Sequence, residues 1–240
     1  MQARYIPSRE ERFRVMFDLV EGEVGPAPRV LDIGCGPGSL SRRLLQRFPS
    51  ARSVGVDYDP VLLRLGPACF PRPLLARMTW VQADLRDPGW ARALPPGRFD
   101  AVLSTTALHW LRPRVLARLY ADLYGRLRPG GVLLNGDKAE LGPGEPRLES
   151  ATSDAMHRRQ RSAAHSPGVA PDWRGWWRSI ATVPALRPAL DLRRQRFETG
   201  TGHEHTVPAA GHVRALRVAG FREADVVWRE FTNVVLMAVR

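Results

Sequence analysis

A short apolar segment that runs straight into a glycine-rich turn constrains the fold of this chain more than any other feature. Residues 30–38 read Val-Leu-Asp-Ile-Gly-Cys-Gly-Pro-Gly, which is typical of a buried strand that stops at a tight turn. A helix is expected to begin at Ser39, and residues 53–57 form a second short apolar strand. Two strands joined by such a helix lie parallel, with a right-handed crossover. The pattern predicts an open, doubly wound α/β sheet.

The same alternation continues and predicts one domain over residues 1–240. Ser8 and Glu11 have the spacing of a capping box, so a first helix is expected from Ser8, and Gly220 is expected to cap the last helix. The last two strands should pair as an antiparallel hairpin at the edge of a mostly parallel, Rossmann-like, seven-stranded sheet. The predicted N-terminal helix covers residues 8–24. The core covers residues 29–137, with strands 29–33, 53–57, 78–83, 99–104 and 132–135 and a helix over 115–127. A helical insertion or lid covers residues 138–206, and the last helix and hairpin cover residues 207–240, with strands 224–228 and 233–239.

Charge and composition indicate which classes of binding partner this domain has. The net charge is +12, and all but one of the 36 basic residues are arginine. These arginines are spread along the chain in doublets at most, whereas nucleic-acid binders usually gather Lys and Arg in a run or stripe. No apolar run approaches the roughly 20 residues that span a bilayer, the first residues lack the apolar core of a signal peptide, and two cysteines cannot build a disulfide framework. We expect a cytoplasmic protein with a small-molecule substrate and neither a nucleic-acid nor a membrane partner; the sequence leaves its oligomeric state open.

The glycine turn and the end of the second strand carry the residues best suited to hold a nucleoside. Gly34, Gly36 and Gly38 form G-x-G-x-G, in which the third glycine comes one residue earlier than in the dinucleotide-binding G-x-G-x-x-G. Asp57 ends the second strand about 20 residues later, the place of the acid that hydrogen-bonds a ribose diol in nucleoside-binding sheets. A bare backbone allows a ligand without phosphate to approach closely. A nucleoside cofactor is predicted here; the alternative for Asp57 is a solvated turn.

Several segments resemble, in their order and spacing, the motifs of the class I S-adenosylmethionine-dependent methyltransferases. The glycine turn 32–38 resembles the first motif of that family, residues 55–59 its ribose-binding segment, and residues 82–85 its adenine-contacting segment. Residues 99–104 match the fourth strand, and residues 127–133 are similar to the Pro-Gly-Gly turn before the fifth. The resemblance implies the doubly wound fold, S-adenosylmethionine as cofactor, and methyl transfer as the activity.

This resemblance, which covers about residues 8–137 and the C-terminal hairpin, also implies roles for particular residues. Asp32 would lie near the methionyl ammonium of the cofactor, and Asp57 would accept hydrogen bonds from both ribose hydroxyls. Asp84 would accept from the adenine amino group, unless it merely caps a helix, and the backbone N–H of Leu85 would donate to the adenine. The full set of cofactor-binding residues implied is Asp32, Gly34, Cys35, Gly36, Gly38, Asp57, Tyr58, Asp84, Leu85 and Ser104.

A substrate-facing stretch is expected after the fourth strand, where ligands of doubly wound sheets bind. Residues 104–110 lack the Asn/Asp-Pro-Pro-aromatic sequence common in nucleic-acid amino methyltransferases, and their Ala-Leu-His-Trp resembles small-molecule members such as the trans-aconitate and malonyl-carrier-protein methyltransferases. His109 is the candidate base for an acceptor hydroxyl or acidic carbon, because imidazole titrates near neutral pH, whereas a carboxylate acceptor needs no base. The alternative is that His109 caps the next helix or packs beside Trp110, which we place in the substrate pocket.

Three tryptophans in the insertion, Trp173, Trp176 and Trp177, would share one face of a helix. They either pack in an added core or line the underside of a lid over the acceptor pocket. We therefore assign them to the substrate pocket as one of two alternatives.

Histidines and cysteines add no further chemistry. His203 and His205 flank one residue in an irregular segment without a cysteine pair, so no metal site is predicted. Cys35 lacks the surroundings of a nucleophile, and Cys69, beside an aromatic residue, is expected in the core.

The sequence thus favours S-adenosylmethionine-dependent methyl transfer to a small organic acceptor at O, C or N, by in-line displacement. Two alternatives remain. An RNA methyltransferase is favoured by the positive charge, and steeply salt-dependent RNA binding would identify it. A protein that binds the cofactor without turnover is the other, because a fold does not fix a function; absence of product across a broad acceptor panel would identify it.

Overall fold

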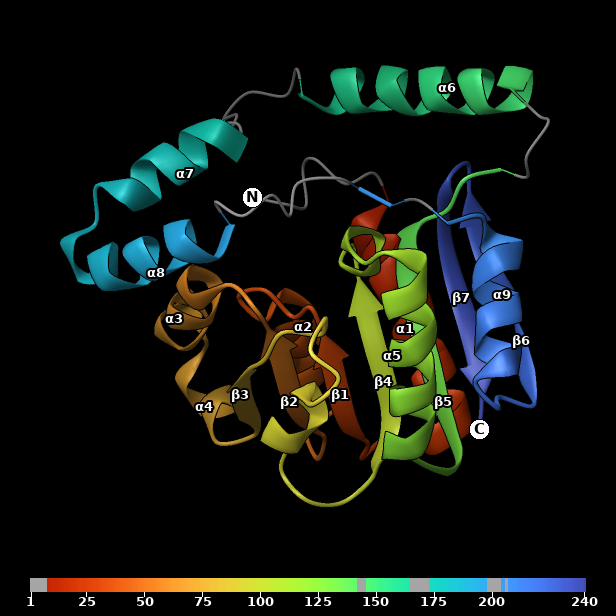
Figure 1. The fold of residues 1–240 in the computed structure, drawn as a ribbon, viewed down its shortest axis with the longest axis horizontal. Helices are drawn as coiled ribbons and strands as arrows, with labels where there is room; N and C mark the ends of the chain where they lie inside the picture. The colour runs from red at the N-terminus through yellow and green to blue at the C-terminus, as the bar shows by residue number, and fades with distance from the viewer. Residues whose placement is uncertain (1–7, 142–145, 165–172, 198–203, 206) are drawn as a thin grey trace.

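The computed structural model of the 240-residue chain describes residues 8–141, 146–164, 173–197, 204–205 and 207–240. Its centre is a seven-stranded sheet in the order β3-β2-β1-β4-β5-β7-β6 (Figure 1). The strands from β3 to β5 run parallel, and β7 is antiparallel to both of its neighbours, which confirms the predicted doubly wound sheet with a hairpin at its edge. The strands are β1 (Arg29–Ile33), β2 (Arg52–Asp57), β3 (Met78–Gln82), β4 (Phe99–Thr105), β5 (Leu127–Lys138), β6 (Glu223–Glu230) and β7 (Asn233–Val239).

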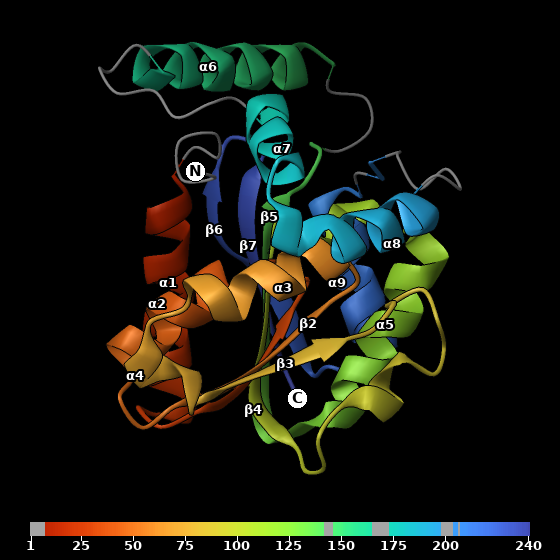
Figure 2. The same ribbon diagram turned by 90° about the vertical axis from the view of Figure 1, so that its left-hand side faces the viewer.

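Helices cover both faces of the sheet because each buries a stripe of apolar residues at helical spacing (Figure 2). On one face, Phe13 and Met16 of α1 pack with Leu44 of α2 over the inner strands. On the other face, Leu119 of α5 and Leu216 of α9 belong to a second buried cluster. These layers hold the sheet rigid beneath the site. The helices are α1 (Arg9–Val24), α2 (Ser39–Arg47), α3 (Pro60–Cys69), α4 (Arg72–Leu75), α5 (Pro113–Arg126) and α9 (Ala209–Val218).

The strand order creates a crossover beside β1. From β1 the chain moves outward through β2 and β3, and it then returns to β4 on the other side of β1. The carboxyl ends of the three central strands are level, because Ile33 pairs with Val56 on one side and with Ser104 on the other. The segments that follow β1 and β4 therefore diverge at one edge of the sheet, which is where doubly wound folds bind ligands.

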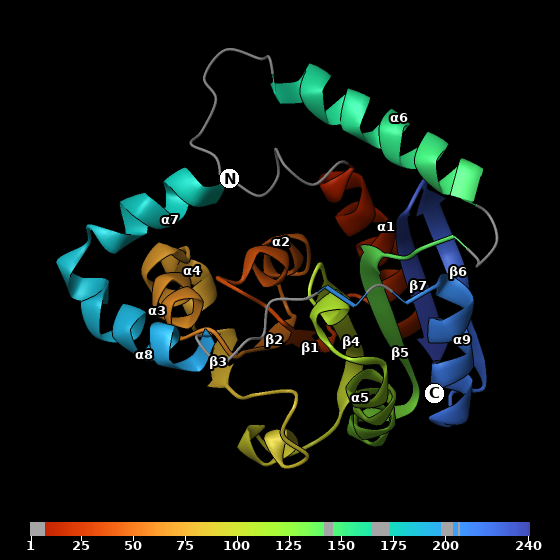
Figure 3. The same ribbon diagram turned by 45° about the horizontal axis from the view of Figure 1, so that its top comes forward.

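Three helices from the predicted insertion lie beyond this carboxyl edge (Figures 1 and 3). They are α6 (Pro146–Ala164), α7 (Trp173–Ala181) and α8 (Arg187–Phe197), and α8 packs against α3. The helical character of the insertion agrees with expectation, whereas its role as a lid stays a prediction. None of the helices in the described part of the chain combines the length and apolar character needed to span a membrane.

Local details differ where a side chain has a partner that sequence spacing does not reveal. Ser8 does not cap α1, because its backbone is left-handed, with a φ of 55°, and its hydroxyl donates to Glu230 of β6. Cys69 is exposed rather than in the core, because Phe70 is the side chain that turns inward at the end of α3. Helices α3 and α4 were not predicted, since prolines interrupt the helical pattern over residues 60–75.

Candidate active site

The turn after β1 presents an open backbone only at its middle glycine. Gly34, Gly36 and Gly38 all have positive φ angles, of 67°, 53° and 77°. A Cβ on Gly34 would lie 2.3 Å from the Cβ of Ala107, and one on Gly38 would lie 2.4 Å from the ring of Trp80, so packing within the protein requires both. A Cβ on Gly36 would meet nothing closer than a methyl group at 3.8 Å. Gly36 is therefore the glycine whose Cα faces space that a ligand can use.

Asp57, at the end of β2, supports this turn. Its Oδ2 accepts a hydrogen bond from the N–H of Gly36 at 2.7 Å, and its Oδ1 accepts one from the N–H of Asp59 at 2.9 Å. Burial raises the pKa of Asp57. Each carboxylate oxygen has two acceptor sites, so each can also accept a hydroxyl of a diol. The carboxylate thus fits a ribose beside Gly36.

Asp32 is buried beneath the same turn, with 1% of its surface exposed. Its Oδ2 accepts from the hydroxyl of Ser41 at 2.6 Å, while its Oδ1 has no partner in the described residues. Burial raises the pKa of Asp32 to about 7. A nearby ammonium group would favour its ionised form, so the predicted place beside the methionyl ammonium fits this unpartnered oxygen.

The residues predicted to contact adenine are engaged with arginines. Asp84 accepts from the backbone N–H of Arg86 at 2.9 Å and forms an ion pair with its guanidinium at 2.8 Å. Burial alone would raise the pKa of Asp84, but the hydrogen bonds from Arg86 lower it. The ring of Tyr58 lies 4.7 Å from the same guanidinium, and the carbonyl of Leu85 accepts from Arg118 at 2.8 Å. Asp84 can receive adenine only at the acceptor sites that Arg86 leaves free.

Ser104 and Cys35 are buried and contribute shape rather than charge. The hydroxyl of Ser104 donates to the carbonyl of Ile33 at 2.8 Å, which ties the end of β4 to the end of β1. Burial raises the pKa of the Cys35 thiol well above its ordinary value. A protonated thiol is a poor nucleophile, which agrees with the expectation that Cys35 has no nucleophilic role.

His109 and Asp137 form a buried pair at the same edge of the sheet. Nδ1 of His109 lies 2.8 Å from Oδ1 of Asp137, and the N–H groups of Leu108 and His109 donate to Oδ2 at 3.1 and 3.2 Å. Burial alone would raise the pKa of Asp137, but the hydrogen bond from His109 lowers it. Because an ionised carboxylate only accepts, Nδ1 carries the proton and Nε2 is the basic nitrogen. The pair has the form of an oriented base.

The alternative to a role as base was that His109 caps the next helix or packs beside Trp110, and the structure shows both neighbours. Its ring lies 5.1 Å from the ring of Trp110, which is 48% exposed. His109 therefore does pack beside Trp110, but the next helix, α5, begins after Arg112 and has no side-chain cap. Packing on Trp110 and pairing with Asp137 occur together and do not exclude each other.

Helix α8 of the insertion is fastened to the loop that follows Asp57. Nε of Arg193 donates to Oδ2 of Asp59 at 2.6 Å, while Oδ1 of Asp59 caps α3. The guanidinium of Arg193 lies 3.9 Å from the ring centroid of Trp177, and the rings of Tyr58 and Phe197 are 5.5 Å apart. The insertion thus contacts the segment predicted to bind the ribose.

The tryptophans of α7 contact each other and helix α8. Trp176 and Trp177 are half-buried and meet edge to face at 4.8 Å. The side chain of Trp173 lies outside the described part of the chain, as does His203. Among the residues that the structure does describe, no group of three His, Cys, Asp or Glu side chains could hold a metal ion.

Known proteins resemble this chain in sequence and in fold. Residues 30–131 match a family model described as a methyltransferase domain. Magnesium protoporphyrin IX methyltransferase from Synechocystis PCC 6803, solved with bound SAH, has a TM-score of 0.56 and 18% identity to this chain, and the match covers 96% of this chain and 82% of that one. The matched domain, the relatives and the fold support a class I S-adenosylmethionine-dependent methyltransferase.

Curated relatives named trans-aconitate 2-methyltransferase match part or most of the chain. Trans-aconitate 2-methyltransferase from Azoarcus sp. (strain BH72) is 38% identical over 131 residues, which are 54% of this chain and 47% of that protein. The protein of the same name from Methylobacterium radiotolerans is 28% identical over 218 residues, 90% of this chain and 71% of its own length. The chain thus spans about half the length of the first of these relatives.

Several residues of this candidate site were not predicted from the sequence. Asp137 is the last residue but one of β5, so the rule that identified Asp57 could have found it, but β5 was expected to stop at Asn135. Arg193 and Asp59 come from segments far apart in the chain, and nothing in either segment alone indicates that they pair. The buried Arg12 looks like any other of the many arginines in the sequence.

Proposed function

We propose that this chain transfers the methyl group of S-adenosylmethionine to a small organic acceptor. The observation that carries the proposal is the open Cα of Gly36 beside Asp57, whose carboxylate holds the Gly36 N–H at 2.7 Å and keeps acceptor sites for a ribose. Relatives named trans-aconitate 2-methyltransferase support a small-molecule acceptor.

The chain's own residues would hold the cofactor at three points. Asp57 would accept the ribose hydroxyls, the unpartnered Oδ1 of Asp32 would face the ammonium, and Asp84 with Leu85 would meet the adenine. When bound, S-adenosylmethionine supplies a methyl group on a positively charged sulfur. Because that carbon is already activated, most of the acceleration comes from holding the acceptor in line with it.

His109 would act as the base for an acceptor that loses a proton. Asp137 fixes the imidazole so that Nε2 is the basic nitrogen, and it compensates the positive charge that the ring gains. Trp110, exposed beside this ring, would form part of the acceptor pocket together with Trp176 and Trp177 of the insertion. A carboxylate acceptor would not need this base.

Calorimetry with S-adenosylhomocysteine tests the proposal directly. We expect binding with one site per chain, and transfer of labelled methyl from S-adenosylmethionine to at least one member of a panel of hydroxylated and carboxylated small molecules. Absence of binding would refute the cofactor assignment. Tight binding with no labelled product across the panel would refute the transfer.

Asp32 predicts an unusual dependence of stability on pH. The folded protein keeps the Asp32 proton up to about pH 7, whereas the unfolded chain releases it near pH 3.8, so this residue lowers stability as pH rises between these values. Asp32→Asn should remove the effect. As pH rises in this window, the free energy of unfolding of the variant should increase relative to that of the wild type by up to about 1.4 kcal/mol per pH unit. Urea denaturation at pH 5, 6 and 7 measures the difference. The exposed-strand variant Asp225→Asn is the control, and a pH-independent difference would contradict the prediction.

Arg193→Met should loosen the insertion from the ribose-binding loop. It leaves the buried Asp59 carboxylate without its 2.6 Å partner, so we expect a loss of about 1 to 2 kcal/mol in the free energy of unfolding. Because the N–H of Asp59 donates to Asp57, S-adenosylhomocysteine should also bind several-fold more weakly. Arg194→Met, next in the helix and 67% exposed, is the matched control. Equal behaviour of the two variants in denaturation and calorimetry would show that α8 does not support the loop.

A further inference from the structure

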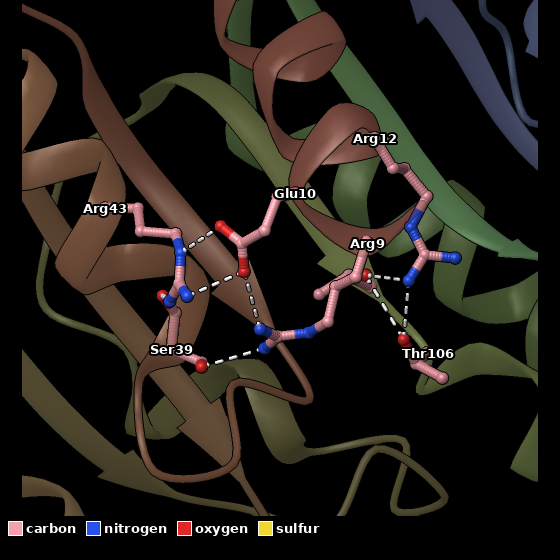
Figure 4. Close-up of polar contacts among 7 residues, drawn as sticks. Arg9, Glu10, Arg12, Ser39, Arg43 and Thr106 are labelled. Carbon is pink, nitrogen blue, oxygen red and sulfur yellow. Dashed lines mark hydrogen bonds and ion pairs between the residues drawn. The ribbon is translucent and has the colours of Figure 1, made fainter. Parts of the chain in front are cut away.

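Two arginines of α1 are buried at the carboxyl edge of the sheet, beside the candidate site (Figure 4). Arg9 is 4% exposed and Arg12 is 1% exposed, whereas the side chain of Arg14, on the same helix, is 64% exposed. Burial lowers the pKa of Arg9 and of Arg12 to about 10. A buried guanidinium needs acceptors for its N–H groups, because water no longer supplies them.

Arg12 lacks most of those acceptors. One terminal nitrogen donates to the hydroxyls of Thr105 and Thr106 at 2.9 and 2.8 Å. Its Nε is buried without a partner, and its other terminal nitrogen donates no hydrogen bond within the described part of the chain. Both acceptors are neutral, and Asp137, the acid that acts on its charge, is hydrogen-bonded to His109. Arg12 is therefore a buried cation that forms no direct ion pair with the described residues.

The surroundings of Arg12 hold its guanidinium in place. Thr106 has a positive φ of 54°, and its N–H donates to the carbonyl of Gly136 at 3.0 Å. A Cβ on Gly136 would lie 2.9 Å from Cδ of Arg12, so the glycine makes room for the arginine. A left-handed backbone at a threonine is costly, and such strain is often found at binding sites. Arg12 thus stands between the ends of β4 and β5, next to the His109–Asp137 pair.

Arg9 has a different setting. One of its terminal nitrogens donates to the hydroxyl of Ser39 at 2.8 Å, and the other lies 3.5 Å from Glu10. Ser39 is the first residue of α2, directly after the glycine turn. Arg9 therefore points toward Ser39 at the start of α2, whereas Arg12 points toward Thr106 after β4 (Figure 4).

We propose that Arg12, presented by Thr105 and Thr106, binds a carboxylate of the acceptor and thereby selects acidic acceptors. The inference rests on the proposed function, because it names the substrate class of the same site. A guanidinium and a carboxylate match in shape and form two parallel hydrogen bonds, which are stronger where water is excluded. The carboxylate would accept from the terminal nitrogens of Arg12 and supply the negative charge that it lacks, and it would anchor the acceptor beside His109.

Calorimetry on the protein saturated with S-adenosylhomocysteine tests the inference. The probes are glutarate, tricarballylate and benzoate, each compared with its uncharged amide. We expect the wild type to bind at least one carboxylate about 10-fold or more tightly than its amide, and Arg12→Gln to abolish this preference while the affinity for S-adenosylhomocysteine stays within about 2-fold. Arg14→Gln removes the same charge from the exposed side of α1 and should change neither affinity.

Several results would overturn the inference. One is a wild type that prefers no carboxylate to its amide, and another is a preference that survives in Arg12→Gln. A loss of S-adenosylhomocysteine affinity as large as the loss of carboxylate affinity would assign Arg12 to the carboxylate of the cofactor instead. If Arg12→Gln does not fold, Arg12→Lys is the test, because lysine keeps the positive charge but lacks the two parallel N–H groups of the guanidinium. The affinity for the carboxylate should then fall about 10-fold while the affinity for the amide stays unchanged. An unchanged affinity for the carboxylate would refute the role of Arg12. Failure of the wild type to bind S-adenosylhomocysteine at all would instead refute the proposed function.

Discussion

Asp57→Ala is expected to weaken the binding of S-adenosylhomocysteine by at least about 100-fold. On the proposed function, the variant would lose two charge-assisted hydrogen bonds from the ribose hydroxyls, each worth about 1.5 to 3 kcal/mol. It also releases the N–H of Gly36, which the carboxylate holds at 2.7 Å, so the glycine turn loses its support. Asp57→Asn keeps the shape and one acceptor oxygen, and its affinity should fall between that of wild type and Asp57→Ala. Isothermal calorimetry measures both.

The controls for Asp57 separate recognition of the diol from damage to the fold. Asp225→Ala, on the edge strand β6, should bind S-adenosylhomocysteine as the wild type does. Wild type should also prefer 5′-methylthioadenosine to its 2′,3′-dideoxy analogue, and Asp57→Ala should bind the two alike. A variant that melts like the wild type and still discriminates between these ligands would show that Asp57 does not hold the ribose.

His109→Ala should lower the turnover of a hydroxyl acceptor by about 100- to 10,000-fold, the range that positioned bases contribute. The affinity for S-adenosylhomocysteine should stay unchanged, because the pair of His109 with Asp137 lies after β4 and β5, away from the ribose-binding loop after β2. Turnover of an acceptor methylated on a carboxylate should fall much less, since that reaction needs no base. Single-turnover kinetics with both kinds of acceptor measure the contrast.

Asp137 is a positioning residue in this scheme, and its variants test the pair. Asp137→Asn should lower turnover less than His109→Ala and should shift the pH profile, because the ring loses the carboxylate that fixes its tautomer. Asp137→Glu should restore part of the rate. The exposed His157→Ala is the control for loss of an imidazole. Unchanged turnover of a hydroxyl acceptor in His109→Ala would refute the role of His109 as a base and would favour a packing role beside Trp110.

Features that depend only on residues close together in the sequence were predicted correctly. The turn 34–38 and Asp57 follow from local chemistry, since glycines at the end of an apolar strand and an acid at the end of the next strand need no knowledge of distant contacts. The doubly wound sheet followed from the parallel pairing expected of strands that are joined by helices. The cap expected at Ser8 failed for the opposite reason, because Glu230, far along the chain, takes its hydroxyl.

The amino-acid sequence by itself determined the doubly wound sheet, the resemblance to methyltransferases and the edge of the sheet at which the candidate cofactor residues lie. Only the tertiary structure decided which polar residues meet there: Asp137 with His109, Asp59 with Arg193, and Arg12 with the threonines that end β4. The physical reason is that burial and ion pairing depend on contacts between segments far apart in the chain. An exposed arginine and a buried arginine look the same in the sequence, and only the fold determines the free-energy cost of burying the charge.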